Sequence, residues 1–318
     1  VDAIVFVTAS GIAVRSVAEH LAHKSEDPAI VCMDECGKHV ISLVSGHAGG
    51  ANALTQMLAD VMWATPVITT ATDVEGRFSI DEYAREHNLV VTDWAKAKAI
   101  SAEVLAAGAE PVWIEEPVVA QGEEKGACEI RKELKSTGID GCENEINVQE
   151  LQIGSHQVII TPQDGSVDVQ TLQLIPRCIV AGVGCKKGTP VDKIEHAVQD
   201  AFAKAGLRME ALCAVVSIDL KKEEAGLLEF CETRNVPFET YAAEELQAVP
   251  GTYSASEFVS GVTGVDNVCE RSAVKYASEH GMNQGEQLLG RQAKHGELLL
   301  RKQAYGGVTV ALAYVCSE

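Results

Sequence analysis

The sequence has no long apolar run and no surplus of positive charge. No stretch approaches the roughly 20 apolar residues of a membrane-spanning helix, so no contact with a membrane is expected. The start of the chain shows no basic region followed by an apolar stretch, so no signal peptide is expected. Twenty-six Lys and Arg stand against 46 Asp and Glu, a net charge of −20. Nucleic-acid binding relies on basic residues that neutralise phosphate, so this balance argues against a nucleic-acid partner.

Several catalytic and metal-binding motifs are also missing. There is no G-x-S-x-G element for a serine-hydrolase triad and no HExxH pattern for a metalloprotease. Among ten cysteines, Cys32 and Cys36 form the one close pair, and they lack the second ligand pair of a zinc site. Scattered cysteines without a secretory signal indicate reduced thiols and a cytoplasmic protein. The cysteine spacing therefore predicts no zinc site.

The chain alternates short β-branched runs with helical patterns, which is typical of α/β architecture with largely parallel sheets. Its 318 residues exceed one ordinary core. Changes in composition predict an amino-terminal α/β domain at 1–76, a middle domain at 77–176 and a carboxyl-terminal α/β domain at 177–318. The middle domain includes an acidic, polar insertion at 121–150. The predicted fold is thus multi-domain α/β, with two mostly parallel domains flanking a smaller one.

Particular segments follow from the same patterns. Strands are predicted at 3–8, ended by Gly11, and at 29–33, 40–44, 66–70, 89–92, 157–161, 171–176, 211–218 and 237–241, with a hairpin of 298–302 and 308–315. Helices are predicted at 51–62, 80–86, 94–106, 191–204, 223–234 and 264–277.

The run Ser45–Asn52 (SGHAGGAN) joins a predicted strand to a predicted helix. Its glycines allow close approach of the backbone to a ligand, and the helix start is expected to present free N–H groups. His47 in this turn is a candidate general base near neutral pH. The alternative is a tight turn in which His47 is solvated at the surface.

Thr69–Asp73 lies at the carboxyl end of the predicted strand 66–70, and ligands in open α/β sheets gather at such strand ends. Thr70 and Asp73 could orient a water or could cap the next helix.

The run Gly182–Thr189 (GVGCKKGT) satisfies neither the Walker spacing nor the dinucleotide spacing. What remains is a nest of N–H groups beside Lys186 and Lys187, which is suited to carboxylates. The alternative is a solvated turn.

Two further segments lie next to predicted helices of the carboxyl-terminal domain. Asp219 could cap the helix 223–234, and Lys221 could meet an anion. Ser254 and Ser256 precede the helix 264–277, which carries Glu270. A lone Glu on a helix usually belongs to a solvated face, so Glu270 by itself carries little weight.

These residues together resemble the cobalt-precorrin-5A hydrolase family, CbiG. The resemblance rests on DPAIVCMDECGKHVISLVSGHAGGANALTQMLAD followed by PVITTATDVEG, and on VAGVGCKKGTP, SIDLKKEEAG and VTVALA. Gly11–Arg15 and Lys24 fit its pattern as well, and the acidic insertion fits it least. The resemblance implies a three-part protein, with roughly one more strand–helix unit before the first residue here.

The resemblance implies a step of anaerobic cobalamin synthesis. The substrate is a contracted tetrapyrrole that carries cobalt, so no further cofactor is expected. The reaction opens the ring A δ-lactone and releases acetaldehyde, leaving cobalt-precorrin-5B. A homodimer and transient contact with neighbouring pathway enzymes are compatible with this function.

The implied catalytic residues are His47 as the base that activates water, Asp73 and Ser45. The N–H groups of Gly49 and Gly50 are expected to stabilise the oxyanion. Peripheral carboxylates are assigned to Arg15, Lys186 and Lys187. The full set of expected substrate contacts comprises Gly46, Gly49, Gly50, Asn52, Arg15, Lys24, Thr70, Gly184, Lys186, Lys187, Asp219, Lys221, Ser256 and Glu270.

Two other functions remain open. One is a tetrapyrrole carrier or chaperone of the same pathway that binds without turnover. The other is a nucleotide-binding α/β protein, which the glycine spacings already disfavour.

Overall fold

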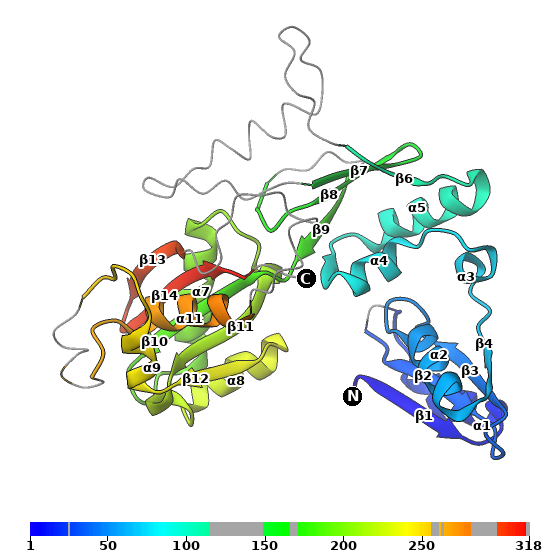
Figure 1. Ribbon diagram of the computed structural model, residues 1–318, viewed down its shortest axis with the longest axis horizontal. Helices are drawn as coiled ribbons and strands as arrows, with labels where there is room; N and C mark the ends of the chain where they lie inside the picture. Colours follow the sequence, from blue (N-terminus) through cyan, green and yellow to red (C-terminus); the bar gives the residue numbers. More distant parts are fainter. Residues whose placement is uncertain are drawn as a thin grey trace, which may run out of the picture. The chain divides into compact units, whose positions relative to one another are not determined.

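The computed structural model describes residues 1–24, 26–114, 149–165, 171–255, 261, 264–280 and 298–315. The predicted acidic insertion falls outside these residues, apart from its last two. The described chain is mixed α/β, as predicted (Figure 1). It forms two compact units, chiefly Val1–Ile114 and Gln173–Glu318. The proposed division into three domains stays a prediction.

The amino-terminal unit begins with a four-stranded sheet in the order β1-β2-β3-β4. The strands are β1 Ala3–Val7, β2 Ala29–Met33, β3 His39–Val44 and β4 Thr65–Val67. The pairs β1/β2 and β3/β4 are parallel, whereas β2/β3 is antiparallel. A short turn suffices between antiparallel neighbours, whereas each parallel pair needs a crossover helix.

Those crossovers are α1, Ser10–Val17, and α2, Ala51–Met62. Gly11 lies inside α1, so the prediction that it ends the first strand is wrong. The core of this layer joins Ala29, Val31 and Val40 of the sheet to small α2 residues. Small side chains allow α2 to lie close to the strands, which places its first turn at the end of β3.

The predicted strand 66–70 ends earlier than expected, at Val67, because the chain leaves the sheet toward α3, Ala71–Glu75. The rest of the unit supplies α4, β5, α5 and β6, which span Ile80–Glu86, Leu89–Val91, Trp94–Ala107 and Pro111–Trp113.

A second sheet has the order β5-β9-β8-β7-β6. Its later strands are β7 Gln149–Ile153, β8 His156–Ile160 and β9 Leu172–Pro176. The sequence patterns predicted β8 and β9 but missed the short β6 and the strand β7.

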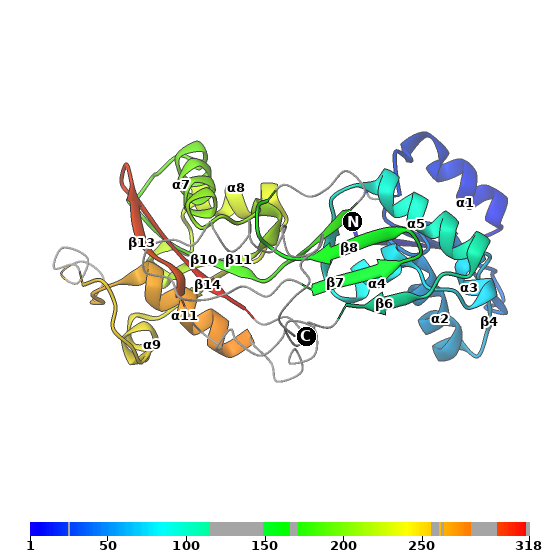
Figure 2. The same ribbon diagram turned by 90° about the horizontal axis from the view of Figure 1, so that it is seen from above.

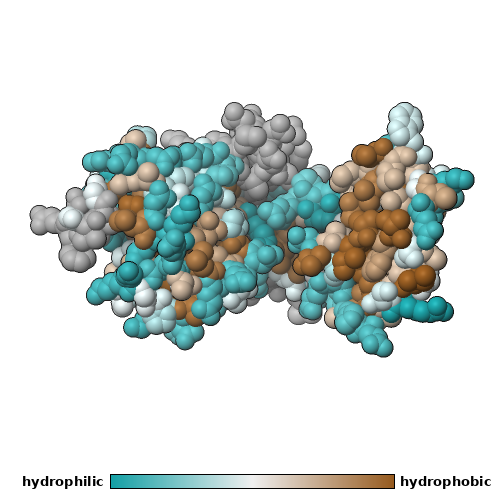
Figure 3. Space-filling model, turned by 90° about the horizontal axis from the view of Figure 1, so that it is seen from below, coloured by the Kyte–Doolittle hydropathy of each residue, from teal (hydrophilic) through white to brown (hydrophobic). Residues whose placement is uncertain are grey.

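The amino-terminal unit also exposes apolar side chains on one face (Figure 3). In this unit the exposed large apolar residues include Val5 and Val7 on the edge strand β1, and Met57 and Val61 on α2. In β1 the exposed side chains alternate with partly buried ones. Part of the outward face of this unit is therefore apolar.

The carboxyl-terminal unit is built on a sheet in the order β12-β11-β10-β14-β13. The strands are β10 Ile179–Cys185, β11 Leu212–Ile218, β12 Phe238–Tyr241, β13 Leu298–Tyr305 and β14 Val308–Tyr314. The strands β10, β11 and β12 run parallel, and the predicted hairpin β13/β14 joins them antiparallel to β10.

Helices cover both faces of this sheet (Figure 2). One face carries α7 Val191–Lys204 and α8 Ala225–Arg234, and the other carries α9 Ala243–Ala248 and α11 Val268–His280. The helix α11 packs very closely on β10, since a Cβ at Gly182 would lie 1.9 Å from the carbonyl oxygen of Cys269. Gly182 is therefore required for helix–sheet packing.

Two findings concern the whole described chain. No helix within it is both long and apolar enough to span a membrane. No disulfide joins the cysteines that it includes.

Candidate functional site

The loop between β3 and α2 folds back on its own backbone. The N–H groups of Ala51 and Asn52 donate to the carbonyls of Ser45 and Gly46, each over 3.0 Å, and Gly50 N–H donates to the carbonyl of His47 over 3.0 Å. The expectation of free N–H groups at this helix start is therefore wrong for these three residues. Gly50 N–H in particular is not available to an oxyanion in this conformation.

The glycines of this loop are required by packing. A Cβ at Gly46 would lie 2.7 Å from Oδ1 of Asn52, and one at Gly49 would lie 2.4 Å from Cβ of Ser45. Gly50 adopts φ +82°, which favours glycine. Ser45 also has a positive φ, and its Oγ is buried without a hydrogen-bond partner among the described residues. The catalytic role expected for Ser45 stays a prediction.

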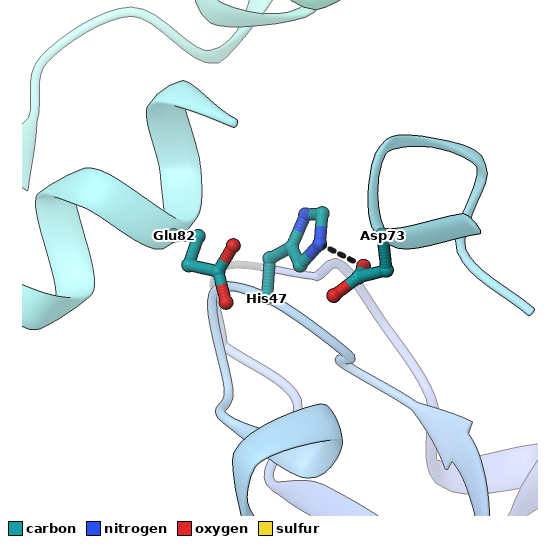
Figure 4. Close-up of side chains that lie close together, drawn as sticks. All are labelled: His47, Asp73 and Glu82. Carbon is teal, nitrogen blue, oxygen red and sulfur yellow. Dashed lines mark hydrogen bonds and ion pairs between the residues drawn. The ribbon is translucent and has the colours of Figure 1, made fainter. Parts of the chain in front are cut away.

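His47 lies at the centre of the site and is only 8 % exposed, so the alternative of a solvated surface histidine is wrong. Its Nε2 lies 2.5 Å from Oδ2 of Asp73 in α3 (Figure 4). This contact brings together two of the residues that the sequence singled out, and the catalytic roles expected for them stay predictions. Thr72 Oγ1 lies 3.3 Å from the same nitrogen.

The other ring nitrogen faces the start of α4. Nδ1 of His47 lies 2.8 Å from Oγ of Ser79 and 3.4 Å from Oδ1 of Asp81. Ser79 donates to that same Asp81 oxygen over 2.6 Å, and Lys24 Nζ donates to the other over 2.8 Å. Lys24, expected to contact substrate, is thus engaged with a carboxylate that is almost fully buried.

Asn52 connects the first turn of α2 to Asp73. Its amide nitrogen donates to Oδ2 of Asp73 over 3.0 Å and to Oγ1 of Thr70 over 3.1 Å. Its amide oxygen accepts from Ser42 over 2.6 Å. Thr70 is the N-cap residue of α3, but its side chain makes no capping bond. Asn52 therefore holds Asp73, and Thr70 in turn holds the Asn52 amide.

These contacts set the protonation of the two buried groups. Burial lowers the pKa of His47, but hydrogen bonds and charges from Asp81 and Asp73 outweigh it and raise the pKa from 6.5 to about 8. Burial also opposes ionisation of Asp81, yet hydrogen bonds from His47, Lys24 and Ser79 hold its pKa well below the usual range. At neutral pH the site pairs an imidazolium with the ionised carboxylate of Asp81.

Glu82 is the third carboxylate near the ring (Figure 4). One ligand-type atom each from His47, Asp73 and Glu82 lies within 4.8 Å of the others, which is close enough to hold a cation. Burial and the charge of Asp73 raise the pKa of Glu82 against the opposing charge of His47. The sequence patterns missed Ser79, Asp81 and Glu82, because S-I-D-E before an apolar run indicates a helix start. Glu82 N–H does donate to Ser79 Oγ, at 3.4 Å.

The loop that follows β10 is closed by a carboxylate of its own unit. Gly188 N–H donates to Oε1 of Glu224, whose other oxygen accepts from Lys221 over 3.1 Å. The anion expected at this nest, and at Lys221, is therefore the Glu224 side chain in this conformation. Lys186 and Lys187 are exposed.

Gly184 and Asp219 also have structural partners. A Cβ at Gly184 would lie 2.7 Å from Oγ1 of Thr309, so strand packing accounts for this glycine. Asp219 accepts from Thr240 over 2.7 Å, and α8 begins only after Glu224, so the expectation that Asp219 caps that helix is wrong.

Glu270 is fully buried, so the solvated-face reading is wrong. Its oxygens accept from the backbone and hydroxyl of Ser254, over 2.8 and 2.9 Å, and from Lys302 N–H over 2.8 Å. Because three donors of the same chain already bond to this carboxylate, Glu270 has a structural role in the described conformation. Ser256 lies outside the described residues, and Arg15 is exposed on α1.

Comparison with known proteins identifies relatives of both units. A family model described as "Cobalamin synthesis G N-terminal" matches residues 1–73, and one described as "Cobalamin synthesis G C-terminus" matches residues 179–313. A cobalt-precorrin-5A hydrolase of Salmonella typhimurium is 35 % identical over 313 residues, covering 98 % of this chain and 81 % of that protein. A cobalt-precorrin-5A hydrolase of Priestia megaterium is 27 % identical over 319 residues, covering 98 % and 78 %.

Solved structures give weaker matches. CobE, a protein from the cobalamin biosynthetic pathway, has a TM-score of 0.36 at 27 % identity and covers 44 % of this chain and 92 % of its own. A cobalamin biosynthesis protein G homologue from Sulfolobus solfataricus has a TM-score of 0.32 at 24 % identity, covering 99 % and 82 %.

Proposed function

The chain belongs to the cobalt-precorrin-5A hydrolase family, and from this membership we propose that it hydrolyses cobalt-precorrin-5A in cobalamin synthesis. The reaction opens the ring A δ-lactone and releases acetaldehyde, leaving cobalt-precorrin-5B. The observation that supports this best is the buried His47, hydrogen-bonded to carboxylates at the end of a glycine-rich loop. Cobalt enters as part of the substrate. The proposed setting is the cytoplasm.

The chemistry requires both a proton acceptor and a stabiliser of negative charge. Water adds to the lactone carbonyl, and the acyl–oxygen bond breaks to give a carboxylic acid and an alcohol on the former meso carbon. The alcohol then becomes the carbonyl of acetaldehyde as its carbon–carbon bond to the macrocycle breaks, and the bonding pair stays with the macrocycle. Carboxylates beside a charged imidazole can serve both halves of this sequence.

The substrate carries several carboxylates, while the protein has a net charge of −20. Local cations must therefore offset the repulsion. We assign this role to exposed side chains: Arg15 in the amino-terminal unit, and Lys186 and Lys187 in the carboxyl-terminal unit. Lys24 is assigned instead to Asp81, to which it donates.

A carrier without turnover is the second candidate. A partial match favours it: Protein CobE from Sinorhizobium sp is 29 % identical over 136 residues, which cover 42 % of this chain. A carrier would bind the pigment and release no acetaldehyde.

The test is acetaldehyde release from enzymatically prepared cobalt-precorrin-5A under strictly anaerobic conditions. Wild type is compared with His47→Ala and with His39→Ala, a control histidine that is exposed at the start of β3. We expect one acetaldehyde per substrate from wild type and from His39→Ala, and a loss of at least about 100-fold in His47→Ala. Bound pigment without release by wild type would favour the carrier.

A further inference from the structure

Both ring nitrogens of His47 face acceptors. Nε2 is held by Asp73, whose same oxygen also accepts from the Asn52 amide. A carboxylate oxygen has no hydrogen to donate, so the hydrogen of this contact is on Nε2.

A count of protons at Ser79 decides the state of Nδ1. A serine hydroxyl has one proton, and Ser79 donates it to Asp81 over 2.6 Å. The Ser79 oxygen that lies 2.8 Å from Nδ1 must then accept, so Nδ1 carries a hydrogen. With hydrogens on both nitrogens, His47 is an imidazolium that has no lone pair to offer a water. This geometry contradicts the general-base role that the sequence suggested for His47.

The three carboxylates around the ring differ in their exposure and in the number of hydrogen bonds that they accept. Asp81 is 7 % exposed and accepts from Lys24 and Ser79. Asp73 accepts from His47 and Asn52. Glu82 is about one-third exposed, and the one ion pair that it forms within the described residues is with Arg85, at 4.0 Å. Glu82 is therefore the carboxylate that can meet both solvent and a substrate.

We propose that Glu82 is the general base of this hydrolase and that His47 acts beside it as a fixed positive charge. The inference rests on the proposed function. A Glu82 oxygen removes a proton from water while the water oxygen bonds to the lactone carbonyl carbon. The carbonyl π electrons move onto its oxygen, which faces the imidazolium.

Collapse of the tetrahedral species re-forms the carbonyl and breaks the acyl–oxygen bond. The leaving alkoxide takes the proton that Glu82 received, so the carboxylate is restored. One water and one lactone thus give one carboxylic acid and one alcohol.

The raised pKa of Glu82 agrees with this role, because a base closer to neutral pH accepts a proton more readily. The groups that face His47 are Asp73 from α3, Asp81 and Glu82 from α4, and Lys24 through Asp81. Together they raise the pKa of His47 to about 8, so the imidazole is charged at neutral pH and loses its charge as the pH passes through that value.

The protonation of His47 is tested without substrate, by NMR of protein labelled with ¹⁵N in its histidines. The signal is assigned by its loss in His47→Gln. Two protonated ring nitrogens at pH 7 are expected. A single protonated nitrogen at that pH would overturn the inference.

The role of Glu82 is tested by turnover of Glu82→Gln, with Glu86→Gln as the matched control on the exposed side of the same helix. Glu82→Gln is expected to lower kcat by about 10²–10⁴-fold with KM nearly unchanged and to remove the acid limb of the pH–rate profile. Glu86→Gln should match wild type, and circular dichroism should show all three proteins folded.

The outcomes separate this inference from the proposed function. An active wild type with an equally active Glu82→Gln would overturn this inference alone. Loss of turnover on chelation, restored by a divalent cation, would also overturn it, because the three side chains would then hold a metal. A wild type that releases no acetaldehyde would overturn the function and, with it, the inference.

Discussion

Lys24 Nζ lies 2.8 Å from Oδ2 of Asp81, although 57 positions separate the two residues. Lys24 is partly exposed, whereas the Asp81 side chain is 8 % exposed. This ion pair supplies one of the charges that keep Asp81 ionised, and Asp81 in turn holds the imidazolium of His47. A surface lysine thus acts on the protonation of a buried histidine through one carboxylate.

Stability of the amino-terminal unit should fall as pH rises from 6.5 to 9. The pKa of His47 is raised by folding from 6.5 to about 8, so its contribution is complete below 6.5 and is lost as the pH passes through about 8. The shift corresponds to roughly 2 kcal/mol. Urea unfolding followed by tryptophan fluorescence measures this unit specifically, because Trp63, Trp94 and Trp113 all lie in it. His47→Gln should lack this pH dependence, and an equal dependence in that variant would contradict the assignment.

Asp81→Asn should destabilise the amino-terminal unit by about 3 kcal/mol, because it leaves His47 and Lys24 without their shared buried carboxylate. The same variant should lower the pKa of His47, which histidine NMR measures directly. Asp60→Asn is the control, since Asp60 is an exposed partner of Gln56 on α2. A pKa for His47 that stays at its wild-type value would show that Asp81 does not control it.

Gly49→Ala should lower both stability and turnover. The new Cβ would lie 2.4 Å from Cβ of Ser45 and 3.3 Å from the backbone nitrogen of Ala29, so the loop must move. Overpacking of this kind costs about 1–3 kcal/mol. Gly11→Ala is the matched control, because it lies inside α1 with open space at its Cβ and should be neutral or stabilising by up to about 1 kcal/mol. Thermal unfolding of the two variants makes the comparison.

Asn52→Ala should lower kcat more than it raises KM. It removes the amide that holds Asp73 and leaves Ser42 without its acceptor, at a cost of about 1–3 kcal/mol. With Asp73 less restrained, the imidazolium loses its fixed direction. Gln56→Ala, an exposed amide on the same helix, is the control. A variant with wild-type kcat would show that Asn52 only stabilises the loop.

Glu270→Ala should destabilise the carboxyl-terminal unit by about 2–4 kcal/mol, because three donors lose one buried acceptor. The loss should appear in circular dichroism, while the tryptophan transition of the amino-terminal unit stays unchanged. Normal stability with a raised KM would instead support the substrate contact expected from the sequence.

Local pattern was enough to locate most of the elements. Helix α4, for example, was predicted at its observed bounds, and the hairpin β13/β14 at nearly its observed place. Hydrophobic periodicity and turn residues are short-range signals, and they persist in the folded chain. Two predictions failed at the ends of elements. Gly11, which was expected to end a strand, lies inside α1, and β4 ends at Val67 although the β-branched run continues beyond it.

The amino-acid sequence alone determined the α/β alternation and the loop that carries His47, and it singled out Asp73 as a candidate. Only the tertiary structure decided how these groups behave. Asp73, Ser79 and Asp81 converge on the imidazole ring of His47, and their proximity raises its pKa to about 8. Likewise, Glu224 accepts from the N–H of Gly188, 36 positions earlier in the chain, in the loop where the sequence predicts a bound anion. Electrostatic interactions fall off with distance through space, and distance through space between remote segments is a property of the fold.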